Sequence, residues 1–234
     1  MIDTISMAIV LAFLLVFSIV TYKKKFLDLE GILVADAIGV AAITFGETNH
    51  VMRLAAFVVF FLIGQLASNF PTKKHERRGI KNVLGNSVPA LIMLFLIPVF
   101  PKYELIFEIG FFGAIAAALS DTLSSEIGYY SKSSPILITT LRKCKRGTDG
   151  GVTLMGEGAA LFGGIIIGLI YFFVYANLVT ALVIVGAGMV GTTADSFFGA
   201  VFERKKVLNN TQVNLLGSAS GALFALLLGL LFII

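Results

Sequence analysis

The sequence predicts an all-α fold: a polytopic transmembrane helix bundle of about eight spans, with both termini outside the cell. Hydrophobic residues make up 57% of the 234 residues and charged residues 14%, whereas soluble domains average about 45–50% apolar and about 25% charged. Mean hydropathy is +0.94. Because a chain this apolar cannot cover a surface that faces water, lipid must be its solvent. The length allows one compact bundle, so residues 1–234 are interpreted as a single integral membrane domain.

Eight segments along the chain are long and apolar enough for membrane-spanning helices, which need about 20 mostly apolar residues. The second segment is the least apolar, because it contains Asp28, Glu30 and Asp36, and the fifth begins apolar and ends polar. Asp36 falls in mid-span, where an acid either packs beside a base or takes part in function. The predicted spans are residues 3–22, 26–46, 51–70, 83–100, 103–128, 153–175, 178–201 and 212–234.

The distribution of Lys and Arg gives the bundle a direction. One set of alternate loops holds 16 of the 18 Lys and Arg residues, and the other set holds only Arg53 and Lys102. Basic loops stay in the cytoplasm, so both termini are expected outside and the long loop 129–152 inside. A wrong helix count would mix the two sets, so the split also supports eight spans. The basic positions fall within 23–25, 73–81, 132–146 and 204–206.

Composition excludes several classes of protein and site. A single cysteine, Cys144, excludes an internal disulfide and a cysteine-based metal cluster. Two histidines, His50 and His75, are too few for a metal site built from histidine. The net charge of +4 is spread over short loops between apolar runs, so nucleic acid is excluded as a partner and membrane lipids are expected instead.

Asp121, Glu126 and Asp195 are acidic residues inside apolar spans, near the cytoplasmic ends of their helices. An ionised side chain in a membrane helix costs about 2.5–3.5 kcal/mol on insertion scales, so it usually marks function. Asp121 and Glu126 are about 140° apart around a helix and can flank a pocket that Asp195 closes. Carboxylates beside phosphate oxygens are typical of Mg²⁺ sites, and we predict that these three hold Mg²⁺. The alternative is pairing with Lys or Arg between helices.

The loop before the sixth span combines basic residues with glycines. Basic side chains attract phosphate, and glycines let backbone N–H groups approach an anion at the start of a helix. The alternative is an ordinary cytoplasmic loop that contacts lipid head groups, but that role needs no glycines. We predict phosphate binding by Arg142, Lys143, Lys145, Arg146, Gly147, Thr148, Asp149, Gly150 and Gly151.

Other polar residues at the same end complete the predicted site. Lys81, Asn82 and Asn86 open the fourth span, and the two asparagines, four residues apart, share one helix face. Ser196 lies late in the seventh span and Asn214 opens the last one. Helix capping is the alternative for such residues. We expect all of them at the nucleotide or phosphate, because they gather at one end of the bundle.

Five stretches over roughly residues 75–220 carry a family resemblance. The pair Asp-Thr-x-x-Ser-Glu and Gly-Thr-x-Gly-Gly is fairly specific where both occur. The motifs resemble, in order, those of the multi-spanning membrane family that includes plant plastid phytyl-phosphate kinase. The chain departs from the family pattern at Asn82 (often Gln), at Asp149 (often Asn) and at Leu123-Ser124 (often Trp-Ala). The stretches are Arg78–Asn86, Ser120–Gly128, Gly147–Thr153, Ala194–Ala200 and Val213–Ser218.

The resemblance implies a reaction. Plant members transfer a phosphoryl group from a nucleoside triphosphate, with CTP favoured, to an isoprenoid monophosphate, and distant kin include dolichol kinase and phosphatidate cytidylyltransferase. For this chain it implies a Mg²⁺-dependent isoprenyl-phosphate kinase of the cell membrane, with an isoprenoid phosphate lipid as substrate. Its active site would face the cytoplasm, with Asp121, Glu126 and Asp195 catalytic. The alternatives are a CTP-dependent lipid cytidylyltransferase and a transporter or lipid flippase without chemistry.

Overall fold

The computed structural model describes residues 4–45, 50–68 and 80–232, and this part of the chain is almost entirely helical. The eight helices in it are α1 (Thr4–Lys23), α2 (Leu29–Thr44), α3 (His50–Ser68), α4 (Ile80–Val99), α5 (Glu104–Gly128), α6 (Leu154–Tyr175), α7 (Leu178–Phe198) and α8 (Asn210–Phe232). A 3₁₀ turn, η1 (Pro101–Tyr103), precedes α5, and a π-helical turn, η2 (Gly199–Glu203), follows α7. Two short antiparallel strands, β1 (Ile136–Leu137) and β2 (Gly151–Val152), join the two ends of the α5–α6 connection.

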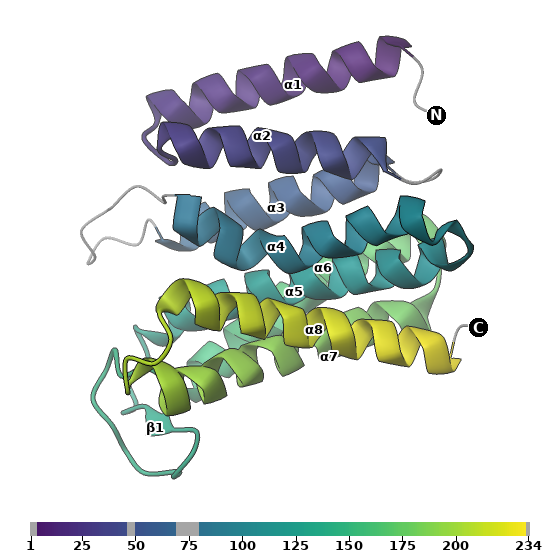
Figure 1. Ribbon diagram of the computed structural model, residues 1–234. Coiled ribbons are helices and arrows are strands. Elements are labelled where there is room, and N and C mark those ends of the chain that lie inside the picture. The colour runs from purple at the N-terminus through teal and green to yellow at the C-terminus, as the bar shows by residue number, and fades with distance from the viewer. Residues whose placement is uncertain (1–3, 46–49, 69–79, 233–234) are drawn as a thin grey trace.

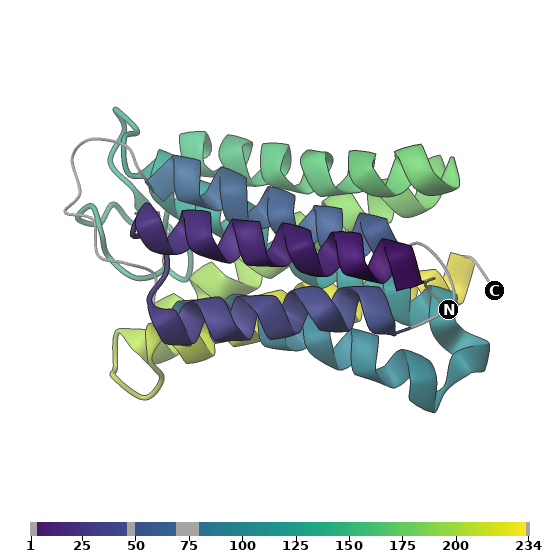
Figure 2. The same cartoon turned by 90° about the horizontal axis from the view of Figure 1, so that it is seen from above.

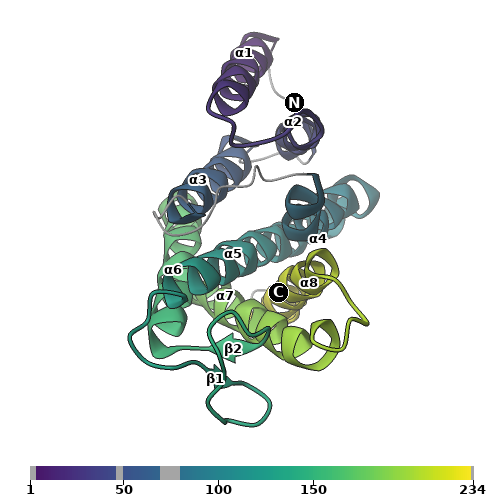
Figure 3. The same ribbon diagram turned by 90° about the vertical axis from the view of Figure 1, so that its left-hand side faces the viewer.

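Helix α5 is the centre of the bundle. It packs against α3, α4, α6, α7 and α8, and Figure 3, a view along the helices, shows it surrounded by them. The most apolar stretch of α5 is 83% buried, compared with 33–44% for the other four long apolar helices. The hairpin of α1 and α2 packs on α3 and α4 through α2 and forms one edge of the bundle (Figure 1).

The helices run alternately up and down, so their connections gather at two ends (Figures 1 and 2). Helix α1 begins and α8 ends at the same end. The α1–α2, α5–α6 and α7–α8 connections lie at the opposite end, which we call the basic end because these connections hold most of the Lys and Arg residues that the structure describes. The predicted division of basic residues between two ends is therefore present in the fold.

Five of the eight predicted spans are confirmed as helices that are long and apolar enough to cross a membrane; they lie at His50–Ser68, Pro101–Gly128, Leu154–Tyr175, Leu178–Glu203 and Asn210–Phe232. Helices α1 and α4 are apolar too, over Met7–Lys23 and Val83–Val99, the parts whose side chains the structure describes. Helix α2 has 16 residues, fewer than the predicted span 26–46. It begins late because Asp28 caps its start: the Asp28 carboxylate accepts a hydrogen bond from the Gly31 N–H at 2.7 Å. Eight membrane crossings and outside termini remain predictions.

Small residues allow α5, α7 and α8 to approach closely. A Cβ atom added to Gly191 of α7 would lie 2.3 Å from the Cβ of Ala117 of α5. One added to Gly221 of α8 would lie 2.6 Å from the same atom. Neither position has room for a side chain, as is usual where membrane helices pack through small residues. Ala117 therefore fixes the register of α5 against both neighbouring helices.

A buried ion pair joins α3, α5 and α6 at the end opposite the basic end. Arg53 and Glu108 are 0% and 1% exposed, and Arg53 Nε donates to Glu108 Oε1 at 2.9 Å. Arg53 Nη2 reaches Glu104 Oε1 at 3.2 Å, and Arg53 Nη1 donates to the Phe45 carbonyl. The Tyr175 hydroxyl donates to the second oxygen of Glu108. Each charge here has specific partners, so the cluster fastens three helices together.

Breaking this pair from one side is expected to destabilise the bundle. In Arg53→Met the Glu108 carboxylate stays buried without its cation, and the free energy of unfolding should fall by about 3–5 kcal/mol. Adding Glu108→Gln should restore part of the loss, because the uncompensated charge is removed. Circular dichroism of the purified protein titrated with SDS in mixed micelles measures this. A single variant as stable as the exposed control Lys102→Met would contradict the expectation.

Candidate active site

A polar pocket of about 280 Å³ opens at the basic end, between the ends of α5 and α7 and the α5–α6 connection. These elements lie next to one another in Figure 3. The pocket brings together residues that are up to 89 positions apart in the chain, from Asp121 to Asn210. Nine of the predicted site residues line it: Asp121, Arg146, Gly147, Thr148, Asp149, Gly150, Gly151, Asp195 and Ser196.

Asp121 of α5 and Asp195 of α7, here called the acid pair, lie within hydrogen-bonding range of each other. Helix α8 closes the space beside them. A Cβ atom added to Gly217 would lie 2.9 Å from the Cβ of Asp195. When the amide of Asn214 is oriented to satisfy its hydrogen bonds, its nitrogen lies 3.2 Å from Asp195 Oδ2. Asn214, which the sequence placed in the site, is thus a neighbour of the acid pair.

The glycine loop, Gly147–Gly151, forms the opposite wall of the pocket. Gly147 and Gly150 have φ values of +75° and +76°, which side-chain-bearing residues rarely adopt. Gly150 also sits against η2: an added Cβ atom would lie 2.4 Å from the Cβ of Ala200 and 2.5 Å from the Ser196 carbonyl oxygen. The loop is therefore docked on the end of α7, which is the helix that carries Asp195.

Of the four basic residues of the α5–α6 connection that were predicted to bind phosphate, the structure brings only Arg146 to the pocket. Its guanidinium donates to the Ser131 carbonyl, which orients it. Arg142, Lys143 and Lys145 are exposed and do not line the pocket. The reason is local. Lys143 forms an antiparallel bridge with Ile136 of β1, which also pairs with β2, and we call these paired segments the ribbon. This part of the loop therefore follows β1 and turns away from the helices.

Glu126 does not join the acid pair. It is not among the residues that line the polar pocket, and its Oε1 accepts a hydrogen bond from the Ser68 hydroxyl of α3 at 3.3 Å. Five residues along a helix rotate a side chain by about 140°, which turns Glu126 away from α7. Within residues 4–45, 50–68 and 80–232, no three His, Cys, Asp or Glu side chains come together as a metal site, so the expected cluster of three carboxylates is not formed.

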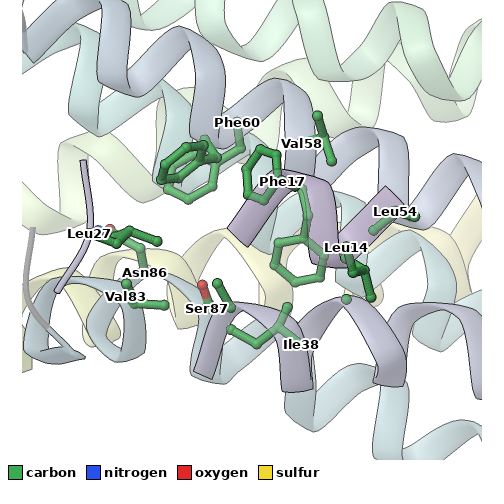
Figure 4. Close-up of a pocket in the computed structure, with 14 residues that line it drawn as sticks. Leu14, Phe17, Leu27, Ile38, Leu54, Val58, Phe60, Val83, Asn86 and Ser87 are labelled. Atoms are coloured by element: carbon green, nitrogen blue, oxygen red, sulfur yellow. The ribbon is translucent and has the colours of Figure 1, made fainter. Parts of the chain in front are cut away.

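Asn86, predicted in the site from the start of α4, lies elsewhere. Asn86 is 7% exposed and lines a separate apolar pocket of about 70 Å³ between α1, α2, α3 and α4 (Figure 4). Ser87 is the other polar residue in its wall, beside Leu14, Phe17 and other apolar side chains. The side chains of Lys81 and Asn82 lie outside the described part of the structure.

Some residues of the polar pocket were not identified from the sequence. Glu203 lies in η2 and faces the pocket. In the sequence it directly precedes the basic run 204–206, so it looks like a charge at the membrane interface, and no local pattern distinguishes it. Thr153 also lines the pocket; its hydroxyl caps α6 by accepting from the Gly156 N–H at 3.0 Å. Ser124 and Asn210 complete this part of the wall.

The acid pair suits Mg²⁺ in its chemistry. Mg²⁺ is typically bound through one or two carboxylates, with phosphate oxygens and water as the remaining ligands. Asp121 and Asp195 supply two carboxylates from different helices, and the hydroxyl groups of Ser125 and Ser196 line the same pocket. A phosphate group in the pocket would also face Arg146 and the glycine loop. The residues present therefore fit a magnesium–phosphate group better than a metal held by protein alone.

The amino-acid sequence matches one family model over residues 12–231, described as integral membrane protein DUF92. It is 34% identical to an uncharacterized membrane protein of Methanocaldococcus jannaschii, over 91% of this chain and 90% of that protein. Two proteins of Arabidopsis thaliana are also similar. The chloroplastic protein VTE6 is 30% identical over 69% of this chain and 51% of its own length, and protein PGR is 29% identical over 84% and 78%.

No solved structure matches the chain significantly. The family match covers nearly the whole sequence, including every segment that forms the polar pocket. It confirms the family resemblance that the five motifs predicted. The chain belongs to the integral membrane protein family DUF92.

Proposed function

We propose that this protein is an isoprenyl-phosphate kinase embedded in the membrane. It transfers the terminal phosphoryl group of a nucleoside triphosphate, preferentially CTP, to an isoprenoid monophosphate. The bond between the β-γ bridging oxygen and the γ-phosphorus breaks, and a phosphate oxygen of the acceptor bonds to that phosphorus. A nucleoside diphosphate leaves, and the isoprenyl diphosphate is the other product. The proposal rests on one observation: the acid pair, Arg146 and the glycine loop meet in a single polar pocket.

Phosphoryl transfer depends on positioning and charge neutralisation more than on covalent chemistry. The acid pair would hold Mg²⁺, which would supply positive charge to neutralise the phosphates. Arg146 can bind a phosphate through two parallel hydrogen bonds, and the glycine loop lets backbone groups approach closely. The acceptor is itself an anion, so the pocket needs no strong general base.

The position of the pocket also suits a lipid substrate. It lies at the basic end of a helix bundle, so a phosphate head group can enter while an isoprenoid tail stays in the bilayer. Basic loops favour the cytoplasmic side. We therefore propose a site that faces the cytoplasm from the cell membrane. The plant phytyl-phosphate kinase in the resembled family supports this class of acceptor.

The decisive experiment asks which phosphorus atom of labelled CTP reaches the lipid product. Purified protein in nanodiscs is incubated with Mg²⁺, geranylgeranyl phosphate and CTP labelled at either the γ- or the α-phosphorus. The γ label should appear in the lipid diphosphate and the α label should stay in water-soluble nucleotide. The α label in a lipid product would instead identify a cytidylyltransferase. If neither CTP nor ATP transfers label to farnesyl or geranylgeranyl phosphate, the kinase proposal is wrong.

Removing either charge of the acid pair should abolish transfer. Asp121→Asn and Asp195→Asn keep the shape of the side chain but lose the charge that balances Mg²⁺, and loss of one such electrostatic group typically costs about 100-fold or more in kcat. The rate of γ-label transfer at saturating CTP measures this. The extracted variants should elute from size-exclusion chromatography like the unaltered protein.

Glu126→Gln is the matched control, because Glu126 is on the same helix but outside the pocket. Its kcat should stay within about threefold of the unaltered protein. A loss as large as that of Asp121→Asn would mean that Glu126 takes part in the reaction, as the sequence predicted when it placed Glu126 with the acid pair.

The glycine loop offers a second matched comparison. Gly150→Ala should raise the KM for CTP severalfold or more, because the added methyl group meets Ala200 and the Ser196 carbonyl and lifts the loop off η2. Gly147 has nearly the same φ, but an added Cβ atom would meet nothing within 4 Å. Gly147→Ala therefore carries only the backbone strain, about 1–2 kcal/mol. Equal KM values for the two variants would contradict a role for loop docking.

A further inference from the structure

Three basic side chains of the α5–α6 connection have no role in the pocket. Arg142, Lys143 and Lys145 are exposed, and none of them lines the polar pocket. In the part of the chain that the structure describes, none forms an ion pair with a carboxylate. These three exposed cations lie within four positions of one another, so the segment carries a concentrated positive charge that attracts anions.

An aliphatic residue lies at the tip of the same segment. Leu141 is 73% exposed and has a φ of +55°, a conformation that is rare for a bulky side chain and costs free energy. The turn is nevertheless ordered: the Leu141 N–H donates to the Leu137 carbonyl at 2.8 Å, and the Leu137 N–H donates to the Arg142 carbonyl at 2.9 Å. We call Leu141, Arg142, Lys143 and Lys145 the ribbon tip.

The α7–α8 connection repeats this combination. Arg204, Lys205 and Lys206 are exposed, Lys206 has a φ of +58°, and Val207 is 64% exposed. We call these four residues the turn tip. The ribbon tip is in the connection that contributes the glycine loop, and the turn tip directly follows Glu203. Each tip is therefore next in the sequence to a residue that lines the polar pocket, Arg146 for the ribbon tip and Glu203 for the turn tip.

The position of the ribbon indicates what such a tip would meet. Figure 3 looks along the helices from the basic end, and the loop that carries β1 projects past α7, outside the outline of the bundle. Figure 1 shows the same loop beyond the ends of the helices. Where the helices cross a membrane, a loop that projects outside the bundle would lie over the lipid around the protein.

We infer that the ribbon tip and the turn tip dock on anionic lipid head groups, with Leu141 and Val207 inserted among them. Lys and Arg near an anionic leaflet are attracted to it, and an aliphatic side chain gains by leaving water for the interface. Docking would hold the mouth of the pocket at the depth in the membrane where the head group of an anionic lipid lies. The inference does not depend on the reaction proposed above.

The test measures the depth of each tip in the bilayer and needs no enzymatic activity. Cys144→Ser removes the single native thiol, and Leu141→Cys or Val207→Cys then carries a nitroxide spin label. Collision with dissolved oxygen, which concentrates in lipid, is compared with collision with an aqueous nickel chelate. The protein is placed in vesicles of phosphatidylcholine, with or without phosphatidylglycerol. Tyr103→Cys, at the opposite end, provides the control label.

With phosphatidylglycerol, both tip labels should collide more with oxygen and less with the nickel chelate, while the Tyr103→Cys label should not change. Raising the salt to about 1 M should reverse the shift, because the Debye length falls from about 10 Å to about 3 Å. Replacing Arg142, Lys143 and Lys145 by Gln should lower the ratio of docked to undocked ribbon tip on the order of 100-fold. Lys102→Gln should leave it unchanged.

Two results would overturn the inference. Tip labels that meet the aqueous chelate equally in both lipids would show that the tips stay in water. A lipid-induced shift that survives neutralisation of the three cations would show that charge does not drive it. Only lipid and the purified protein are present, so a buried tip label in these vesicles cannot be attributed to a protein partner. Circular dichroism checks that the variants keep their helix content.

Discussion

The register between α5, α7 and α8 is the constraint on which the polar pocket depends. Ala117 fits between Gly191 and Gly221, where neither glycine has room for a side chain. One helical turn nearer the basic end, four residues along each helix, come the acid pair and Gly217. The packing of Ala117 against the two glycines therefore also sets the carboxyl groups of Asp121 and Asp195 opposite each other. Helix α8 lies so close to Asp195 that position 217 has no room for a side chain larger than that of glycine. A shift of one residue in this register would separate the acid pair.

The two ends of the bundle treat buried charge in opposite ways. At one end Arg53 and Glu108 satisfy each other and are sealed from solvent. At the basic end the acid pair opens to a polar pocket, with Glu203 and Asp149 in the wall and Arg146 as the nearby cation that lines it. Buried charges are stable only when they are paired or hold a cation. The first arrangement serves stability, whereas the acid pair has no ion pair with a described Lys or Arg and is where we propose that Mg²⁺ binds.

Helices were easier to predict from the sequence than the directions of side chains. The fifth and sixth predicted spans agree with α5 and α6 to within one residue at each end, because polar residues bound both apolar runs. Asp121 and Asp195 were found because each breaks an apolar pattern, and the glycine loop was found because its glycines follow a basic run. The orientation of Glu126 was not predictable, since a polar residue at a helix end has no apolar stripe that shows which neighbour it faces. The π-helical turn that carries Glu203 has no sequence signature.

The basic loop shows why composition alone cannot separate a binding site from a topology signal. Arg142, Lys143, Lys145 and Arg146 form one run in the sequence, and orientation in the membrane and phosphate binding both favour such a run. In the structure this run has two parts: Arg142, Lys143 and Lys145 lie outside the pocket, and Arg146 lines it. Before Arg146 the backbone pairs with β1 and its side chains face outward; after it, glycines in a left-handed conformation turn the chain back onto α7. The glycines, and not the charges, therefore decide which cation reaches the pocket.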